Sequence, residues 1–430
     1  MIAVLFRKEP PMKPILKNEV IGQGARVQLL LPEISRRTVL DTVMEAGMEA
    51  LRAMLEEERS KLCGPRYAHG VEREAWRAGY APSELAMGGR RVSLRRPRVR
   101  NADGEVELPS WERFAAEDPL GKRAVEQVLV GVSTRKYGRS LEPMPPGVKT
   151  RGTSRSAVSR RFVEKTAEHF EAMIRRNLRE IDLVALIIDG LHIGEYLILV
   201  ALGIDAGGNK HVLGLYEGAT ENATACKGLL ADLEQRGMRT DRSLLVVIDG
   251  SKALRAAVDA VFGERAIVQR CQVHKRWNVE DHLPESMKLS IGRAITKAYR
   301  SRDAERAQRI LEGLARQLER EHPQAAASMR EGLQETLTVM RLGLPEWLER
   351  TLATTNPIEN LNGSIRRITR NVKRWDDGRM VLRWVAAALT EAAKGFRKLR
   401  GYKGMPKLFG ALRAHDAALG ITLETEGQAA

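Results

Sequence analysis

Residues 182–271 of this 430-residue chain follow an order of elements that few folds accommodate. Three β-rich runs come close together, and two further strands then alternate with helices. The strands are expected at 182–190, 196–205, 210–218, 243–250 and 266–271, and the helices at 222–237 and 251–263. Consecutive strands followed by strands with crossover helices predict a mixed α/β sheet.

Two of these strands end in the same dipeptide. The run "LVALIIDG" ends with Asp189 and the run "LLVVIDG" ends with Asp249. Polar groups at the carboxyl ends of strands gather at one edge of an open α/β sheet, where sites form. One Asp-Gly pair is merely a turn signal. Two of them on apolar strands sixty residues apart predict a shared site.

Paired carboxylates repel each other unless a cation lies between them. The expected cation is Mg²⁺, because it binds a few carboxylates and completes its shell with water and substrate phosphate. Two such ions roughly 3.5–4 Å apart activate a water or hydroxyl and stabilise the leaving 3′ oxygen of a phosphodiester. The sequence therefore predicts two Mg²⁺ ions, which Mn²⁺ can replace, and it requires a third acid.

We expect the third acid to be Glu359, in "TTNPIENLNGSIRR". Asn356 suits the N-cap of a helix, and Pro357 suits its first position. Arg366 and Arg370 follow Glu359 on one helical face, as a DNA-facing helix requires. An alternative stays open at this point, because an acid three residues after an N-cap also occupies the capping-box position.

The charge of the chain indicates a polyanionic partner. It carries 71 Lys and Arg against 55 Asp and Glu, a net charge of +16. Binding to phosphates releases counterions and favours such a chain. The turn "NADG" between Val99 and Val106 predicts a β-hairpin, whose first arm is rich in arginine. Further along, "SRSAVSRRF" predicts a helix with Ser154 as N-cap, which would suit a helix-turn-helix. The proline-rich "EPMPPGVKTRG" before it argues against a compact motif.

Cys271 and His274 form a Cys-x-x-His in "RCQVHKRWN". This spacing is half of a zinc finger, but a structural zinc site takes four ligands, usually as two pairs. Cys63 and Cys226 lie far away and alone, so the sequence provides no second pair. We therefore expect a structural role beside the site, with Lys275 and Arg276 available to phosphate.

Four segments together resemble a known family: "IIDG", "VVIDGSKALRAAV", "VQRCQVHKRWNVEDHLP" and "TTNPIENLNGSIRR". They are similar, in this order over roughly residues 180–375, to the Mutator-type transposases of bacterial insertion sequences. The resemblance implies a ribonuclease H-like core with a largely helical insertion. It also implies an Asp-Asp-Glu triad of Asp189, Asp249 and Glu359, which acts in DNA cleavage and strand transfer.

These observations divide the chain into six regions. We expect a helical region at 1–62, a DNA-binding region at 63–178, the first part of the core at 179–270, a helical insertion at 271–354, the last part of the core at 355–400 and a tail at 401–430. The residues expected to contact DNA are Arg95, Arg96, Arg98, Arg100, Ser154, Arg155, Arg160, Lys275, Arg276, Arg366, Arg367 and Arg370.

The expected partners are the terminal inverted repeats of an insertion sequence and its target DNA, bound by a homodimer or a larger assembly. With no export signal or apolar run of about 18 residues, we expect a cytoplasmic, nucleoid-associated protein and no membrane partner. Two other functions stay open. One is a non-catalytic helix-turn-helix regulator, and the other is a ribonuclease H-like nuclease acting on branched DNA or hybrids.

Overall fold

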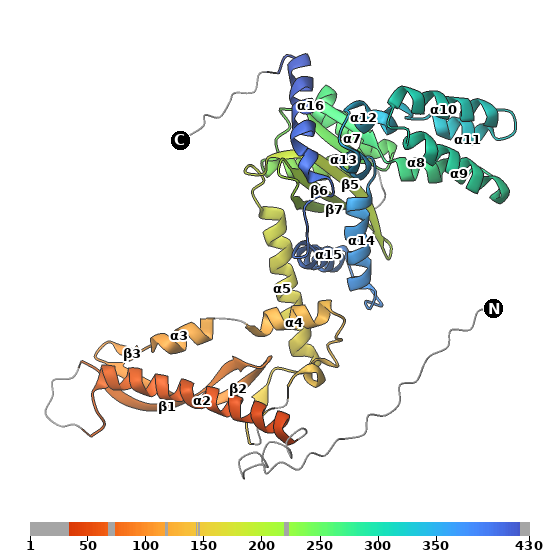
Figure 1. Cartoon of the computed structure of the whole chain (residues 1–430). Coiled ribbons are helices and arrows are strands. Elements are labelled where there is room, and N and C mark those ends of the chain that lie inside the picture. Colours follow the sequence, from red (N-terminus) through yellow and green to blue (C-terminus); the bar gives the residue numbers. More distant parts are fainter. Residues whose placement is uncertain are drawn as a thin grey trace, which may run out of the picture. The chain divides into compact units, whose positions relative to one another are not determined.

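A computed structural model describes residues 34–67, 74–116, 119–142, 144, 147–218 and 223–421. The chain folds as two compact units, each of which has its own core (Figure 1). The first unit takes in Gly138–Thr153 and the described residues up to Pro119. The second takes in Leu120–Tyr137 and the described residues from Ser154 onward.

The first unit is a helix packed on a small antiparallel sheet. The helix is α2 (Ile34–Cys63), and the strands are β1 (Trp76–Met87), β2 (Arg90–Asn101), β3 (Gly104–Val106) and β4 (Thr150–Arg151), with α3 (Pro109–Ala116) after β3. Leu55, Val99 and Leu108 are fully buried between them. The predicted hairpin is confirmed as β2–β3, and the Asn101 side chain accepts the N–H groups of its turn. The sequence did not reveal β1, the longer partner of β2.

The second unit contains the predicted mixed sheet. Its strands are β5 (Leu183–Ile193), β6 (Tyr196–Asp205), β7 (Lys210–Gly218), β8 (Leu244–Ile248) and β9 (Ala266–Arg270), in the order β7-β6-β5-β8-β9. The first three are antiparallel neighbours, whereas β8 runs parallel to β5 and β9. Helices α6 (Ala223–Gln235) and α7 (Lys252–Phe262) pack on one face. Burial of both faces explains the nearly continuous apolar runs in the sequence.

The region predicted to be helical follows β9 and has a core of its own. It comprises α8 (Gln272–Glu280), α9 (Glu285–Tyr299), α10 (Ala304–Leu318), α11 (Pro323–Arg330), α12 (Thr338–Arg341) and α13 (Glu346–Leu352). Helices α8 to α11 extend beyond the edge of the sheet (Figure 1). No helix within the described ranges is long and apolar enough to span a membrane.

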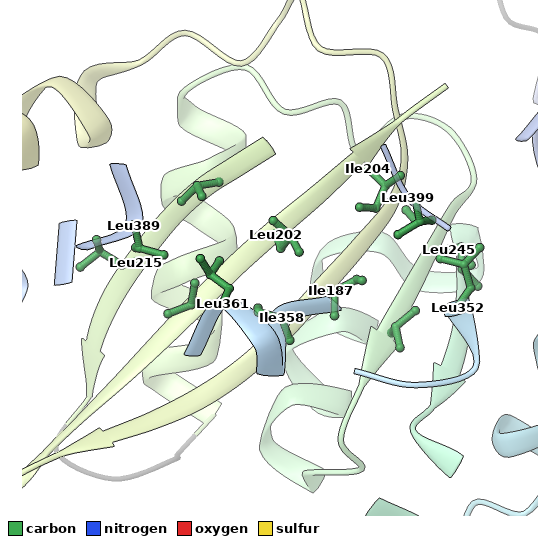
Figure 2. Close-up of a cluster of buried hydrophobic side chains, with 14 of the residues drawn as sticks. Ile187, Leu202, Ile204, Leu215, Leu245, Leu352, Ile358, Leu361, Leu389 and Leu399 are labelled. Carbon is green, nitrogen blue, oxygen red and sulfur yellow. The ribbon is translucent and has the colours of Figure 1, made fainter. Parts of the chain in front are cut away.

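The last helices cover the second face of the sheet. They are α14 (Asn356–Thr369), α15 (Gly378–Ala393) and α16 (Met405–Ala418). Figure 2 shows Ile358 and Leu361 of α14 beside Ile187 and Leu202 of the sheet. Burial of an apolar side chain contributes about 1.5–3 kcal/mol, so this contact fixes which face of α14 remains free.

A compact helix-turn-helix is not formed before the sheet. Helices α4 (Pro119–Leu129) and α5 (Arg155–Arg175) are separated by residues 130–154, which include a short 3₁₀ turn and β4. A helix-turn-helix needs a connection of about three or four residues. Ser154 is confirmed as the N-cap of α5, and its side chain accepts the Ala157 N–H at 3.3 Å.

Candidate active site

The sheet brings the first two acids to one edge. Strands β5 and β8 are parallel neighbours, and Ile187 pairs with Val247. Asp189 and Asp249 each lie two residues further along, so the register places them at matching positions. The expectation that the first strand ends at Asp189 was wrong, because β5 continues to Ile193 in pairing with β6 alone. Asp189 therefore lies where β5 separates from β8.

The turn after Asp249 requires a glycine. Gly250 has a φ of +108°, and a Cβ atom there would lie 2.1 Å from Nε of Arg270. Asp249 Oδ1 accepts the Ser251 N–H at 2.9 Å, and Ser251 then caps α7. The Asp-Gly-Ser run thus turns the chain sharply from strand into helix and holds the carboxylate at the turn.

The third acid comes from α14, on the free side of the docked helix. Ile358 is fully buried, whereas the neighbouring Glu359 side chain is 31% exposed. The pKa of Asp189 is raised to about 6, mainly by burial and also by the negative charges of Asp249 and Glu359, while His274 opposes the rise. Glu359 and both aspartates therefore share one electrostatic environment.

Asn362 adds an unsatisfied oxygen beside these acids. Its Nδ2 donates to Asp189 Oδ2 at 2.7 Å. A carboxylate only accepts, so this bond fixes the orientation of the amide. The side-chain oxygen of Asn362 then has no hydrogen-bond partner among the described residues, although the residue is only 2% exposed. Three carboxylates with a lone amide oxygen form the hard oxygen donor set that Mg²⁺ prefers, so the residues fit this ion.

Cys271 joins the end of the sheet to α14. Its N–H donates to the carbonyl of Ile248, the last residue of β8, at 2.8 Å. Its sulfur accepts the backbone N–H of Thr355 at 3.4 Å. The Cys271 side chain is fully buried, and Cys271 is the N-cap residue of α8. The Cys-x-x-His thus occupies the junction between the sheet, the helical insertion and the helix that carries Glu359.

Thr355 holds the third acid. It is the N-cap residue of α14, one residue earlier than the predicted Asn356. The Thr355 hydroxyl donates to Glu359 Oε1 at 2.6 Å and lies 3.3 Å from His274 Nδ1. A capping box at the predicted N-cap would direct the Glu359 carboxylate to the N–H of Asn356. That N–H instead donates to the Thr354 hydroxyl at 3.4 Å, so the capping-box alternative for Glu359 is wrong.

Cys271 and His274 shift each other's pKa. Burial alone would raise the pKa of the Cys271 thiol, but hydrogen bonds from His274 and Thr355 outweigh it, and the pKa is lowered. The hydrogen bond to Cys271 raises the pKa of His274 to about 9, against the opposing effect of burial, with help from Glu359 and Asp249. At neutral pH the pair therefore places a positive charge on His274, 3.9 Å from Glu359 Oε1.

These groups also form a cluster with metal-ligand chemistry. The ligand atoms of Cys271, His274 and Glu359 all lie within 4.8 Å of one another. The sequence argument against zinc considered only cysteine and histidine pairs, and it missed that Glu359 lies beside them. Sulfur, imidazole and carboxylate ligands suit Zn²⁺, whereas oxygens alone suit Mg²⁺. Glu359 belongs to both donor sets.

The residues predicted to contact DNA differ in how accessible they are in the structure. Lys275 is only 1% exposed and donates to the backbone carbonyls of Ser328 and Glu331, and burial lowers its pKa to about 8. It is not accessible to phosphate, so we withdraw it from the predicted contacts. Arg276 is partly exposed and lies 3.3 Å from Glu280. The accessible candidates of the second unit are Ser154, Arg155, Arg160, Arg366, Arg367 and Arg370.

Within the hairpin, Arg96 and Arg98 both pair with Glu105, at 3.1 and 2.7 Å. Arg95 and Arg100 remain exposed. The arginine-rich arm thus combines structural ion pairs with cations that solvent, or a phosphate, can reach.

Comparison with known proteins gives one consistent result. Residues 24–398 match the family model described as "Transposase, Mutator family". The chain is 29% identical over 381 residues to the transposase for insertion sequence element ISRM5 of Rhizobium meliloti, covering 86% of this chain and 90% of that protein. It is 25% identical over 395 residues to the transposase for IS1081 of Mycobacterium tuberculosis, covering 87% and 92%.

Proposed function

This chain belongs to the Mutator family of transposases, and we propose that it binds the terminal inverted repeats of its insertion sequence, hydrolyses phosphodiester bonds there and joins the freed ends to target DNA. The family implies DNA binding, cleavage and strand transfer. The proposal adds the residues that perform these steps, the cofactor and an assembly of at least two subunits, because two element ends must be brought together.

The observation that carries the proposal is the convergence of Asp189, Asp249 and Glu359 beside Asn362. Three carboxylates in one partly buried site destabilise one another unless a cation joins them. The sheet order β7-β6-β5-β8-β9, with a helical insertion between the second and third acids, supports a ribonuclease H-like core. We assign the three acids as ligands of two Mg²⁺ ions.

Each neighbouring residue has a defined task in this scheme. Asn362 orients Asp189, and Thr355 fixes the carboxylate of Glu359. The charged His274 lies beside Glu359, with Nδ1 3.9 Å from Oε1. When bound, the divalent ions supply activation of the attacking hydroxyl and stabilisation of the leaving oxygen. Arg366 and Arg370, exposed on α14 beyond Glu359, bind phosphates next to the cut.

The test is cleavage of a labelled duplex that carries the inverted repeat flanking the gene. Wild type should cut it with Mg²⁺ and not with EDTA, while Glu359→Gln binds it normally and cuts at least about a thousandfold more slowly, since the metal contributes several kcal/mol. Glu305→Gln, on the exposed surface of α10, is the matched control and should cut normally. Equal cutting by wild type and Glu359→Gln would remove the triad assignment.

The same assay separates the other two functions. A non-catalytic regulator binds the repeat and never cuts it, with or without Mg²⁺. A structure-specific nuclease cuts DNA junctions or RNA–DNA hybrids in preference to the repeat. Preferential cutting at the repeat end, followed by joining of that end to a second duplex, is expected only of the transposase.

A further inference from the structure

A groove of about 740 Å³ lies between α8 and α9 of the helical insertion. Most of the polar side chains that line it are cationic. The cations are Arg276, Lys288, Arg293, Lys297 and Arg300, and the acids are Glu280 and Glu285. The groove lies outside the triad and outside the basic segments that the sequence indicated, apart from Arg276.

Two of the five cations that line the groove are paired with acids, and three are not. Glu280 lies 3.3 Å from Arg276, and Glu285 lies 2.8 Å from Lys288. Exposed cations at 293, 297 and 300 have no ion pair and no side-chain hydrogen bond within the part of the chain that the structure describes. Three unbalanced positive charges thus line one groove.

The spacing of these cations suits a phosphate backbone. Positions 293, 297 and 300 share one face of α9 and span about 10 Å at a rise of about 1.5 Å per residue. Successive phosphates of one DNA strand advance about 3.4 Å along the duplex axis, so the row covers about three of them. Gly292 forms the floor, because a Cβ atom there would lie 1.9 Å from the Glu280 carboxylate. The absence of a side chain at Gly292 therefore allows α8 and α9 to pack closely.

The groove continues toward the candidate active site. An adjoining cavity of about 550 Å³ shares Arg276, Thr296 and Arg300 with it. This second cavity is also lined by Thr354 and Asn356, on either side of the Thr355 that holds Glu359. Its two acids are outnumbered by four arginines, Arg276, Arg300, Arg302 and Arg350.

The first of these acids, Glu346, pairs with Arg302 and Arg350 at 3.7 and 3.6 Å. The second, Glu349, is buried, and burial raises its pKa. A path bordered by cations thus leads from α9 to the start of α14.

We propose that this groove binds the phosphate backbone of the DNA that extends from the phosphodiester held at the triad. The inference rests on the proposed function for the identity of the polymer and adds the surface that guides it. Binding at the groove positions the scissile bond and is independent of base sequence, since the three cations meet phosphates. Phosphate contacts of this kind fix register and orientation.

The test compares two triple variants with the same loss of charge. Arg293→Ala, Lys297→Ala and Arg300→Ala remove the groove cations, and Arg306→Ala, Arg309→Ala and Arg320→Ala remove exposed cations elsewhere in the insertion. Affinity for a fluorescein-labelled 30-base-pair duplex of mixed sequence is measured from 50 to 200 mM salt. The plot of log K against log salt should become shallower by about 2.7 for the groove variant, at about 0.9 per phosphate contact. The control should keep the wild-type slope.

Two further variants guard against misfolding. Leu289→Glu places one negative charge on the exposed rim, where the side chain is 64% exposed, and should weaken binding. A triple variant with Arg293→Lys, Lys297→Arg and Arg300→Lys keeps the positive charge of the groove. It should bind the duplex with the wild-type affinity and salt dependence. Equal slopes for the groove and control variants would overturn the proposal while Mg²⁺-dependent cutting by wild type still supports the transposase. Absence of any cutting by wild type is the separate result that would overturn the proposed function.

Discussion

Asp189 and Glu359 are acids of one candidate site, but the fold holds them in different ways. Asp189 is 8% exposed, and the backbone ladder between β5 and β6 fixes its position. Glu359 lies on the first turn of α14, and its carboxylate is held by one hydroxyl, that of Thr355. Thr355 is held in turn by Cys271, 84 residues earlier in the chain.

The difference separates two kinds of positioning. A residue in a sheet keeps its place as long as the strands pair, whereas a residue on a docked helix depends on a few specific contacts. The sheet half of the site should therefore respond to changes of charge, and the helix half to changes of single hydrogen bonds. The following variants test this division, beginning with the largest expected effect.

Asp189→Asn should stabilise the metal-free protein. The pKa of Asp189 is raised to about 6 from 3.8, so the folded state holds this proton more tightly than the unfolded state. Its contribution to stability is complete below about pH 3.8 and is lost as pH rises through 6, by at most about 3 kcal/mol. Asparagine carries no charge, so Asp189→Asn should regain this free energy of unfolding at pH 8. Urea unfolding of both proteins in EDTA, at pH 5 and at pH 8, measures the gain.

The control for this variant is Glu305→Gln. The Glu305 carboxylate is exposed on α10, so its removal should leave the free energy of unfolding unchanged. A gain at pH 8 that shrinks toward pH 5 is the expected pattern for Asp189→Asn. If wild type and Asp189→Asn unfold alike at pH 8, the three acids do not repel one another and the shared site is lost.

Asn362→Ala should lower cleavage by about 10–100-fold, the usual cost of losing a residue that orients a metal ligand. Both the bond to Asp189 and the unsatisfied amide oxygen disappear. Higher Mg²⁺ should restore part of the rate, because affinity for the ion is the property that suffers. Asn360→Ala, exposed on the same helix, is the control. Equal rates for the two variants at every Mg²⁺ concentration would show that Asn362 has no part in the site.

The sheet half of the site could be predicted from the sequence. Apolar runs that end in Asp-Gly, separated by a helix, follow from local patterns that repeat every few residues. The sequence also placed Glu359, Arg366 and Arg370 together on one face of α14. The order of all five strands and the helices between them was correct for the same reason.

The helix half depends on contacts that no local pattern contains. Nothing near Thr355 indicates that its N–H meets Cys271 or that its hydroxyl meets Glu359. Lys275 looks like any basic residue of an exposed helix, yet α11 buries it. The only signal that could have pointed to Thr355 is the preference of N-caps for threonine just before a proline-led turn.

Thr355→Val should slow cleavage by about tenfold. It removes one hydrogen bond to a charged group, worth about 1.5 kcal/mol, and keeps the shape of the side chain. Thr351→Val, whose hydroxyl bonds only within α13, is the matched control. In combination with Cys271→Ala the losses should not add, because both changes release the same carboxylate. Additive losses would mean that Cys271 acts on the site by another route.

The smallest expected effect concerns the titration of His274, which lies in the helix half of the site. The pKa of His274 is raised to about 9 from 6.5, mainly by its hydrogen bond to Cys271. The stability from this charged pair is therefore complete below about pH 6.5 and is lost as pH rises through 9. Cys271→Ala should return the pKa toward 6.5, which ¹³C-histidine NMR can follow, with exposed His192 as an internal reference.

A wild-type His274 that titrates near 6.5 would contradict this account of the pair. A shift of the His274 pKa in Cys271→Ala, together with a gain in stability from Asp189→Asn that is equal with and without Cys271→Ala, would instead sharpen the division. It would show that the charge on His274 belongs to the helix that carries Glu359 and that the sheet holds Asp189 without it. Zn²⁺ should give the complementary result, since an ion bound by Cys271, His274 and Glu359 would withdraw only the helix acid from the triad. Inhibition by Zn²⁺ should consequently weaken in Cys271→Ala.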